Sequence, residues 1–264
     1  MLDILLPLLI LGVLGILFGC LLGYASKKFA VEKDPLYINI REALPGANCG
    51  ACGYAGCDAY AKAVAASEAA PNRCSVGGQA AADAIAQCLG VEAAAMERQI
   101  ARVACKGGCA EAPDKAEYYG IADCREAAMT AGGGTKACRF GCLGLGTCEA
   151  VCPFGAIHVH NGVAETDPEK CTGCGACTKA CPRQLIQLVP EKEYIYLPCS
   201  SQDRGKEVKQ VCSVGCIGCG LCAKACPQMA ITMEKNRPVI QRDICLGCNS
   251  CVEKCPTGIL QNLR

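Results

Sequence analysis

The sequence of 264 residues contains no tryptophan, four phenylalanines and two histidines. So few aromatic side chains cannot build a large aromatic core. The formal charge is only +1, so the chain also lacks the strongly basic balance typical of nucleic-acid-binding proteins. These shortages argue against a nucleic-acid partner and favour small modules in which bound metal supplies part of the folding free energy.

Motifs for nucleotide and flavin chemistry are missing as well. We find no Walker loop and no covalent flavin signature, and stretches such as Gly132-Gly133-Gly134 lack the strand–helix context of a dinucleotide fingerprint. The acidic residues are scattered. His158 and His160 fall on one face of a predicted strand, where an exposed or packing role is more common than metal ligation. We therefore expect no flavin, no nucleotide and no catalytic site on this chain.

Cysteine, in contrast, is abundant, with 27 residues. A disulfide scaffold, zinc sites and iron–sulfur clusters are the competing explanations. Disulfide scaffolds are usually short and secreted, whereas here lysines follow the apolar N-terminal stretch in place of a signal-peptide cleavage pattern. An odd number of cysteines also leaves one outside any fully paired framework. Metal-bound thiolates in a reducing compartment fit the composition better.

The N-terminal stretch predicts a membrane anchor. Residues 4–24 are apolar and uncharged, which is long enough for one transmembrane helix. Asp3 is the only charged side chain before this run, while Lys27 and Lys28 follow shortly after it. The positive-inside rule therefore predicts a single-pass protein of the cell membrane, with the bulk of the chain on the cytoplasmic side.

A first group of cysteines lies in the sequence LPGANCGACGYAGC, and a fourth cysteine follows a helix predicted over residues 58–69. The four are Cys49, Cys52, Cys57 and Cys74. The glycines permit tight turns that let closely spaced thiolates converge, and their amides can donate hydrogen bonds to cluster sulfurs. Four cysteines also suit tetrahedral zinc, but the C-x2-C-x4-C spacing favours a 4Fe–4S cluster.

The second half of the chain is a tandem repeat. Bacterial ferredoxin runs, C-x2-C-x2-C-x3-C-P, begin at Cys171, Cys216 and Cys245, and a run that begins at Cys142 lacks one cysteine. When the sequence is shifted by 74 residues, eight cysteines between 138 and 181 fall on eight others without a gap. A hairpin is predicted between the two runs of each copy. This is the layout of a two-cluster ferredoxin, present twice.

Ligand sets follow from that layout, because the cysteine before proline binds the other cluster in two-cluster ferredoxins. The predicted complete sets are Cys171, Cys174 and Cys177 with Cys152; Cys216, Cys219 and Cys222 with Cys255; and Cys245, Cys248 and Cys251 with Cys226.

The fourth set is incomplete. It contains Cys142, Cys148 and Cys181, and Leu145 stands where the second copy has Cys219. We favour Cys138 as the fourth thiolate of a 4Fe–4S cluster, and a 3Fe–4S centre is the alternative. In the second copy Cys212 aligns with Cys138, although the matching ligand set there already has four cysteines. Cys138 and Cys212 can therefore share a different role.

These assignments predict five 4Fe–4S clusters. A sixth would form if Cys88, Cys105, Cys109 and Cys124 came together, although their irregular spacing is more typical of buried free thiols. Cys20 is expected to pack within the apolar segment, and Cys199 has no assigned role.

The expected fold class is α+β, with an N-terminal transmembrane helix, a small α-rich 4Fe–4S domain and tandem two-cluster ferredoxin-like modules. The predicted boundaries are 1–28 for the anchor, 29–90 for the N-terminal 4Fe–4S domain, 91–134 for a connecting segment with extra cysteines, 135–190 for the first module and 191–264 for the second.

The order of these parts resembles the B subunits of the Rnf complex, an ion-translocating ferredoxin:NAD oxidoreductase. The resemblance covers essentially the whole chain and rests on the anchor, the LPGANCGACGYAGC loop with Cys74, the stretch KACRFGCLGLGTCEAVCPFGAI and the tandem runs. It implies that the chain accepts electrons from reduced soluble ferredoxin and relays them to other membrane and peripheral subunits, which hold flavins and translocate ions.

Two other functions remain open at this point. One is a membrane-tethered polyferredoxin that serves another dehydrogenase or hydrogenase, which would differ in the subunits that copurify. The other is a structural zinc protein, which would contain zinc without labile sulfide.

Overall fold

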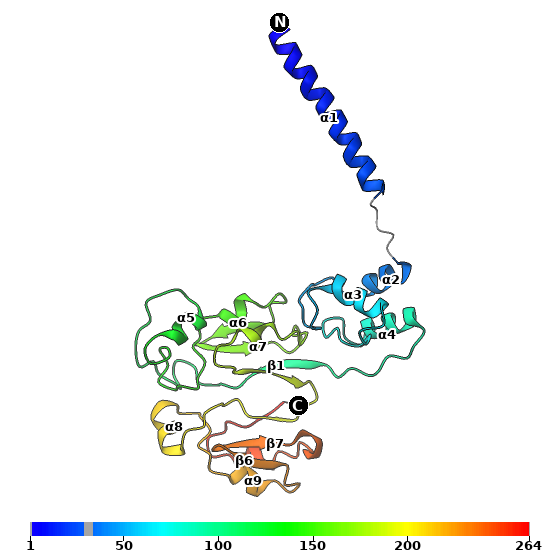
Figure 1. Cartoon of the computed structure of the whole chain (residues 1–264). Coiled ribbons are helices and arrows are strands. Elements are labelled where there is room, and N and C mark those ends of the chain that lie inside the picture. Colours follow the sequence, from blue (N-terminus) through cyan, green and yellow to red (C-terminus); the bar gives the residue numbers. More distant parts are fainter. Residues whose placement is uncertain (1, 29–33, 264) are drawn as a thin grey trace.

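A computed structural model describes residues 2–28 and 34–263, with side chains from residue 9 onward (Figure 1). The expected boundary between residues 28 and 29 lies at the edge of a gap in this description, and the start of the predicted N-terminal domain, 29–33, falls outside it. The described chain has an N-terminal helix, a helical domain and two modules with small antiparallel sheets. The expected α+β class is confirmed.

Helix α1 (Leu2–Lys28) stands apart from the other elements in Figure 1. Its described apolar side chains are exposed, including Leu11 and Ile16. Residues Leu9–Lys28 are long and apolar enough to cross a membrane, and no other helix in the described part of the chain meets that test. Exposed apolar side chains of this kind are stable in lipid rather than in water.

The N-terminal domain consists of three helices, α2 (Pro35–Ala43), α3 (Cys57–Ala65) and α4 (Gly78–Leu89). Their buried core contains Ile40, Tyr60, Val64 and Ile85. The Tyr60 hydroxyl donates to the Ala70 carbonyl and accepts the Arg73 amide, at 2.7 and 3.1 Å. This phenol therefore fixes the segment that leads to the fourth cysteine of the first group.

Helix α3 is shorter than the helix predicted over residues 58–69. It ends at Ala65, and Ser67 adopts a left-handed conformation with φ of 60°. The amides of Glu68 and Ala69 both turn back to the Ala63 carbonyl, at 2.8 and 3.2 Å. This turn satisfies the last carbonyls of the helix before Pro71 is reached.

The first module contains two antiparallel strand pairs (Figure 1). Strand β2 (Ile157–His160) pairs with β3 (Val163–Thr166) through the predicted turn at Asn161-Gly162, where φ is 47° and 72°. The outer pair joins β1 (Gln99–Val103) to β4 (Ile186–Pro190). The short helices are α5 (Cys124–Met129), α6 (Thr147–Ala150) and α7 (Ala176–Ala180).

Strand β1 belongs to the segment that the sequence indicated as a connector. Ile100 and Ala101 are buried in the same core as Ile157 and Ile186 of the first module. The expected boundary at residue 135 therefore separates β1 from the strand with which it pairs.

The second module repeats the arrangement. Strand β6 (Ile231–Glu234) pairs with β7 (Arg237–Ile240), which matches the predicted second hairpin, and β5 (Ile195–Tyr196) pairs with β8 (Gln261–Asn262). The helical elements are α8 (Gly205–Val211), α9 (Leu221–Ala225), the 3-10 turn η1 (Arg242–Ile244) and α10 (Ser250–Glu253).

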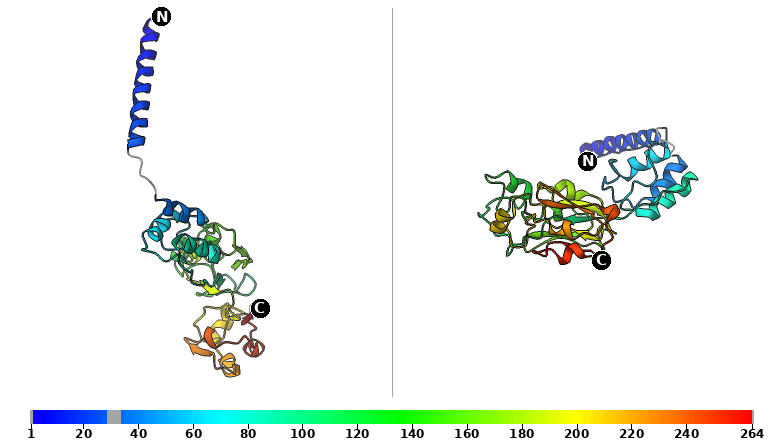
Figure 2. Two further views of the ribbon diagram at one scale, coloured as in Figure 1. Left: turned by 90° about the vertical axis from the view of Figure 1, so that its right-hand side faces the viewer. Right: turned by 90° about the horizontal axis from the view of Figure 1, so that it is seen from below.

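The two modules pack directly against each other, with the second on the side away from the N-terminal domain (Figures 1 and 2). Arg139 forms an ion pair with Asp203 across this seam. The Ser200 hydroxyl donates to the Phe140 carbonyl at 2.9 Å, and the Ser213 amide donates to the Glu111 carbonyl at 2.9 Å. The seam is thus held by polar contacts from both sides.

Candidate metal centres

The first site forms in the loop before α3. Asn48 accepts the Cys57 amide on its side-chain oxygen at 2.9 Å, and this bond folds the loop that carries Cys49 and Cys52. Cys74 approaches from the following segment, and its sulfur accepts the Gly77 amide at 3.3 Å. Burial raises the pKa of Cys74, and the thiols of Cys57, Cys49 and Cys52 raise it further, so the four predicted side chains are neighbours.

The second module brings its first crossed set together in one cavity. Cys216, Cys219 and Cys222 line a cavity with an empty volume of about 330 Å³, and Cys255 lines the same cavity from the later run. In the other crossed set, burial and then the nearby thiols of Cys245, Cys222 and Cys226 raise the pKa of Cys251 to about 11. The side chains before proline thus face the opposite run, as a two-cluster ferredoxin requires.

The first module repeats this crossing for the set that begins at Cys171. Burial and then the thiols of Cys171, Cys174 and Cys152 raise the pKa of Cys177 to about 11. The Cys171 sulfur accepts the Ala101 amide of β1 at 3.4 Å, and the Cys152 sulfur accepts the Ala156 amide at 3.3 Å. Amides that donate to ligand sulfurs are a recurrent means of tuning cluster potentials.

The incomplete set has a different fourth neighbour from the one expected. Cys142, Cys148 and Cys181 line a cavity of about 360 Å³, and its fourth cysteine is Cys124. Burial and then the thiols of Cys142, Cys124 and Cys181 raise the pKa of Cys148 to about 12. Cys138 lines a separate cavity at the seam between the modules, so the favoured role of Cys138 in this set does not agree with its position.

Cys124 reaches this cavity because the first module is longer here than the second. Cys105 follows strand β1, and Cys199 follows strand β5. Because β1 pairs with β4 in the same register in which β5 pairs with β8, Cys105 and Cys199 occupy equivalent positions in the two modules. Cys138 follows Cys105 by 33 positions, whereas Cys212 follows Cys199 by only 13 positions. The additional segment contains α5, whose first residue is Cys124, and the Thr147 hydroxyl accepts the Cys124 amide at 2.6 Å.

The four additional cysteines suggested by the sequence do not form one site. Cys124 and Cys105 line different cavities. Cys88 is exposed near the end of α4, and Cys109 is exposed beside Gly162. All cysteines in the described part of the chain are free of disulfides.

The donor sets suit a cluster better than a single ion. Zinc binds thiolates at about 2.3 Å, which brings tetrahedral sulfurs within about 4 Å of one another. Within residues 2–28 and 34–263, no three His, Cys, Asp or Glu side chains are grouped for a single metal ion. Four thiolates that line one shared cavity, instead of meeting around a single ion, fit the larger iron–sulfur core.

Arg183 places a positive charge beside the Cys124 cavity, which it lines. Its guanidinium donates to the carbonyls of Cys138 and Gly141 at 3.0 and 2.6 Å, and also to the Gly133 carbonyl. Burial lowers the pKa of Arg183, whereas nearby cysteine thiols, including Cys142, favour its charged form. The residue at the equivalent position of the second copy is Thr257, so the two modules differ in charge here.

The two histidines lie away from the cysteine cavities. His158 makes hydrogen bonds to the Glu149 carboxylate at 3.0 Å and to the Gly155 carbonyl at 2.9 Å. The bond to Glu149 raises the pKa of His158. Glu149 also accepts the Val159 amide at 3.0 Å, so these contacts join α6 to β2 and serve the fold.

The fold and the cysteine cavities together define a multi-cluster iron–sulfur protein of the ferredoxin type with an apolar N-terminal helix. Family models agree with this class. An Fe-S cluster family matches residues 44–76, a 4Fe-4S dicluster domain matches 215–259, and 4Fe-4S binding domains match 136–156 and 164–187. The chain therefore carries several iron–sulfur clusters, and these matches disfavour the structural zinc hypothesis.

Relatives that match over most of their length identify the family. The chain is 51% identical to the B subunit of the Na⁺-translocating ferredoxin:NAD⁺ oxidoreductase complex of Acetobacterium woodii, over 91% of this chain and 72% of that protein. It is 43% identical to the B subunit of the proton-translocating complex of Clostridium ljungdahlii, over 92% and 86%. The B subunit of an ion-translocating oxidoreductase complex of Methanosarcina acetivorans is 40% identical over 78% of each chain.

The chain belongs to the family of B subunits of ion-translocating ferredoxin:NAD⁺ oxidoreductase complexes, the Rnf complexes. It is an iron–sulfur electron carrier and a component of a membrane complex, and the resemblance stated from the sequence is confirmed.

Proposed function

We propose that this chain is the electron-input subunit of its complex, which receives single electrons from a reduced soluble ferredoxin and relays them to partner subunits. The main observation in support is the convergence of cysteines from distant runs in cavities that follow one another through the molecule. A 4Fe–4S cluster bound at such a site supplies reversible one-electron transfer. The protein supplies the thiolates, the amide donors and the exclusion of water.

Five four-thiolate sites support five 4Fe–4S clusters. They are the N-terminal set, the two crossed sets of the second module, the set that begins at Cys171, and the set of Cys142, Cys148 and Cys181. We assign the fourth ligand of that last set to Cys124, because Cys124 lines its cavity and Cys138 does not.

The sites have an order in space. The paired sets of each module are neighbours through their crossed cysteines. At the other end of the first module, an open cavity is lined by Ser75 and Val76, next to Cys74, and by Cys171 and Thr172. This shared lining supports a position of the N-terminal site beside the set that begins at Cys171. The N-terminal site therefore forms one end of the route, and the second module forms the other.

The soluble donor is expected to dock on the second module. Cys219 and Cys248 are exposed there, whereas Cys174, the equivalent of Cys248 in the first module, is only partly exposed. Exposed apolar side chains flank these cysteines, with Leu246 65% exposed and Leu221 44% exposed. A small, partly apolar surface suits a transient electron-transfer complex.

The anchor supports attachment to the cell membrane by one span with the modules on the cytoplasmic side, in keeping with Lys27 and Lys28 after the apolar run. Binding of a soluble ferredoxin would require this orientation.

The proposal is tested by mixing the full chain, purified in detergent without oxygen, with reduced ferredoxin in a stopped-flow instrument. We expect cluster bleaching that saturates with ferredoxin concentration and slows when Leu246 is replaced by Glu. The exposed Met129→Glu change in the first module serves as the matched control. If ferredoxin reduces the Leu246→Glu protein as fast as the control, donor docking at this surface is wrong.

A polyferredoxin that serves another dehydrogenase or hydrogenase is the second candidate, favoured only by the generality of the ferredoxin runs. Affinity purification from solubilised membranes separates the two. Recovery of integral-membrane subunits of an ion-translocating complex supports the input role, and recovery of a dehydrogenase or hydrogenase alone supports the alternative.

A further inference from the structure

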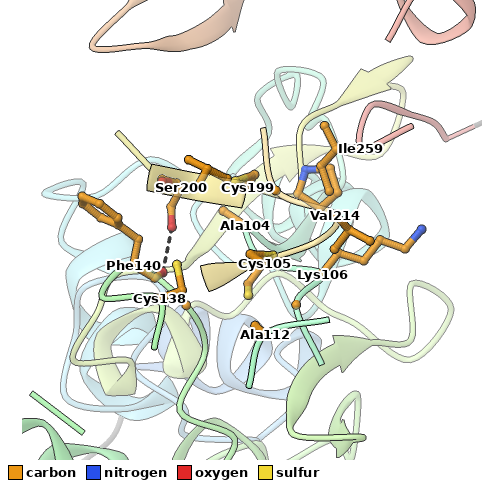
Figure 3. A pocket seen from close by; sticks show the side chains of 17 residues that line it. Ala104, Cys105, Lys106, Ala112, Cys138, Phe140, Cys199, Ser200, Val214 and Ile259 are labelled. Atoms are coloured by element: carbon orange, nitrogen blue, oxygen red, sulfur yellow. Dashed lines mark hydrogen bonds between the residues drawn. The ribbon is translucent and has the colours of Figure 1, made fainter. Parts of the chain in front are cut away.

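A third cavity lies at the seam between the two modules. Its empty volume is about 380 Å³, close to the 330 and 360 Å³ of the two ferredoxin-type cavities described above. Four cysteines line it, two from each module: Cys105, Cys138, Cys199 and Cys212. Figure 3 shows Cys105, Cys138 and Cys199 around one hollow, beside the hydrogen bond from Ser200 to Phe140. The remaining lining is largely apolar and includes Ala104, Val208 and Ile259.

Thiols of the two modules are neighbours across the seam. A Cβ built at Gly107 would lie 3.4 Å from the Cys212 sulfur and 3.9 Å from the Cys105 sulfur, so the two modules meet at this glycine. Burial raises the pKa of Cys138, and the thiols of Cys199 and Cys212 across the seam raise it further. Burial also raises the pKa of Cys105, and the thiols of Cys142 and Cys138 contribute to this rise. Each cysteine is therefore close to at least one cysteine of the set.

The cavity has the approximate two-fold symmetry of the module pair. Cys105 and Cys199 are equivalent by strand register, and Cys138 and Cys212 are equivalent in the 74-residue repeat. The Cys105 sulfur accepts the Cys142 amide at 3.3 Å, and the Cys199 sulfur accepts the Cys216 amide at 3.4 Å. The same two thiols and the same amide donor thus occur on both sides, which a chance grouping of packing cysteines would not produce.

We propose that Cys105, Cys138, Cys199 and Cys212 bind a further 4Fe–4S cluster at the seam. The site then completes a six-cluster protein in which 24 of the 27 cysteines are ligands. The other three are Cys20 in the apolar helix and the exposed Cys88 and Cys109. The Cys142 and Cys216 amides belong to ligands of the adjoining sites, so the seam site joins the two modules into one continuous route.

This inference requires that the chain be loaded with iron–sulfur clusters, but it does not depend on ferredoxin being the donor. The full chain, purified in detergent without oxygen, is analysed for iron, zinc and acid-labile sulfide. We expect about 24 iron and 24 sulfide per chain. The Cys199→Ala/Cys212→Ala protein should lose about four of each, while the Cys88→Ala/Cys109→Ala control should lose none.

A second variant removes the cluster without removing a thiol. Gly107→Ala places a methyl group 2.9 Å from the Ala112 Cβ and toward the Cys105 and Cys212 sulfurs, so we expect it to lose about four iron while it keeps all cysteines. This variant decides the question if the double variant does not fold.

Two results would overturn the inference. One is a wild-type content of about 20 iron that neither variant lowers, which would leave the five-site proposal and the electron-input role intact. The other is one zinc per wild-type chain that the double variant lacks. A wild-type protein with little iron would instead refute the proposed function itself.

Discussion

Arg183 gives a quantitative prediction about cluster potentials. Its guanidinium lies against the cavity of Cys124, Cys142, Cys148 and Cys181 and donates to the Cys138 carbonyl at the seam. A fixed positive charge favours the reduced, more negative state of a nearby cluster and thereby raises its reduction potential. The Arg183→Gln change removes that charge but keeps an amide donor for the neighbouring carbonyls.

The magnitude follows from Coulomb's law. Two unit charges about 7 Å apart at an effective dielectric constant of about 20 interact by about 2.4 kcal/mol, which corresponds to about 100 mV for one electron. Arg183 is only partly buried, so solvent reduces this value. We expect Arg183→Gln to lower the potential of the adjoining cluster by about 40 to 100 mV.

The assay is a potentiometric titration of the full chain, monitored by electron paramagnetic resonance, with iron content as a check on occupancy. Arg183→Lys keeps the charge and should move the potential by less than about 30 mV. Thr257→Arg introduces the same charge at the equivalent position of the second module and should raise a potential there. If Arg183→Gln retains all its iron and every potential stays unchanged, the electrostatic reasoning is wrong.

Three further predictions concern individual residues. Cys124→Ala should lose a cluster or leave a 3Fe–4S signal, and the added Leu145→Cys change should restore the lost iron because position 145 matches Cys219. Full occupancy of the Cys124→Ala protein by 4Fe–4S clusters would contradict the assignment. Cys181→Ser should damage the site of Cys142 and Cys148, and damage confined to the site of Cys171 would refute the crossed ligation. Because the pKa of His158 is raised in the folded protein, its pairing with Glu149 stabilises the fold fully below the unfolded pKa of about 6.5, and this stability is lost as the pH rises through the folded pKa. The melting temperature of His158→Gln should therefore differ from that of the wild type more at acidic than at alkaline pH. An equal difference at every pH would exclude this effect.

Much of the site architecture could be predicted because ferredoxin runs have a fixed spacing. The short loops between cysteines leave few conformations, so the crossed sets and both hairpins were predictable from local sequence. The partner of the incomplete set was not, because Cys124 arrives from α5 in a segment that has no counterpart in the second copy.

The seam cavity was hidden for a related reason. The 74-residue shift aligns Cys138 with Cys212, but Cys105 and Cys199 are 94 residues apart because of the same additional segment. Their equivalence rests on the pairing of β1 with β4 and of β5 with β8, which joins segments far apart in the sequence and is not visible in the residue types of either segment alone. The alignment of Cys138 with Cys212, for which the ligand sets gave no explanation, was the only sign of the seam site in the sequence.

The seam also sets an order for maturation of the protein. Each module carries only half of the four thiols at the seam, so neither half can hold a metal core on its own. The first module emerges earlier during synthesis and must keep Cys105 and Cys138 reduced until β5 and α8 have folded against it. Cofactor insertion at the seam would then report that both halves of the molecule have been built and correctly joined.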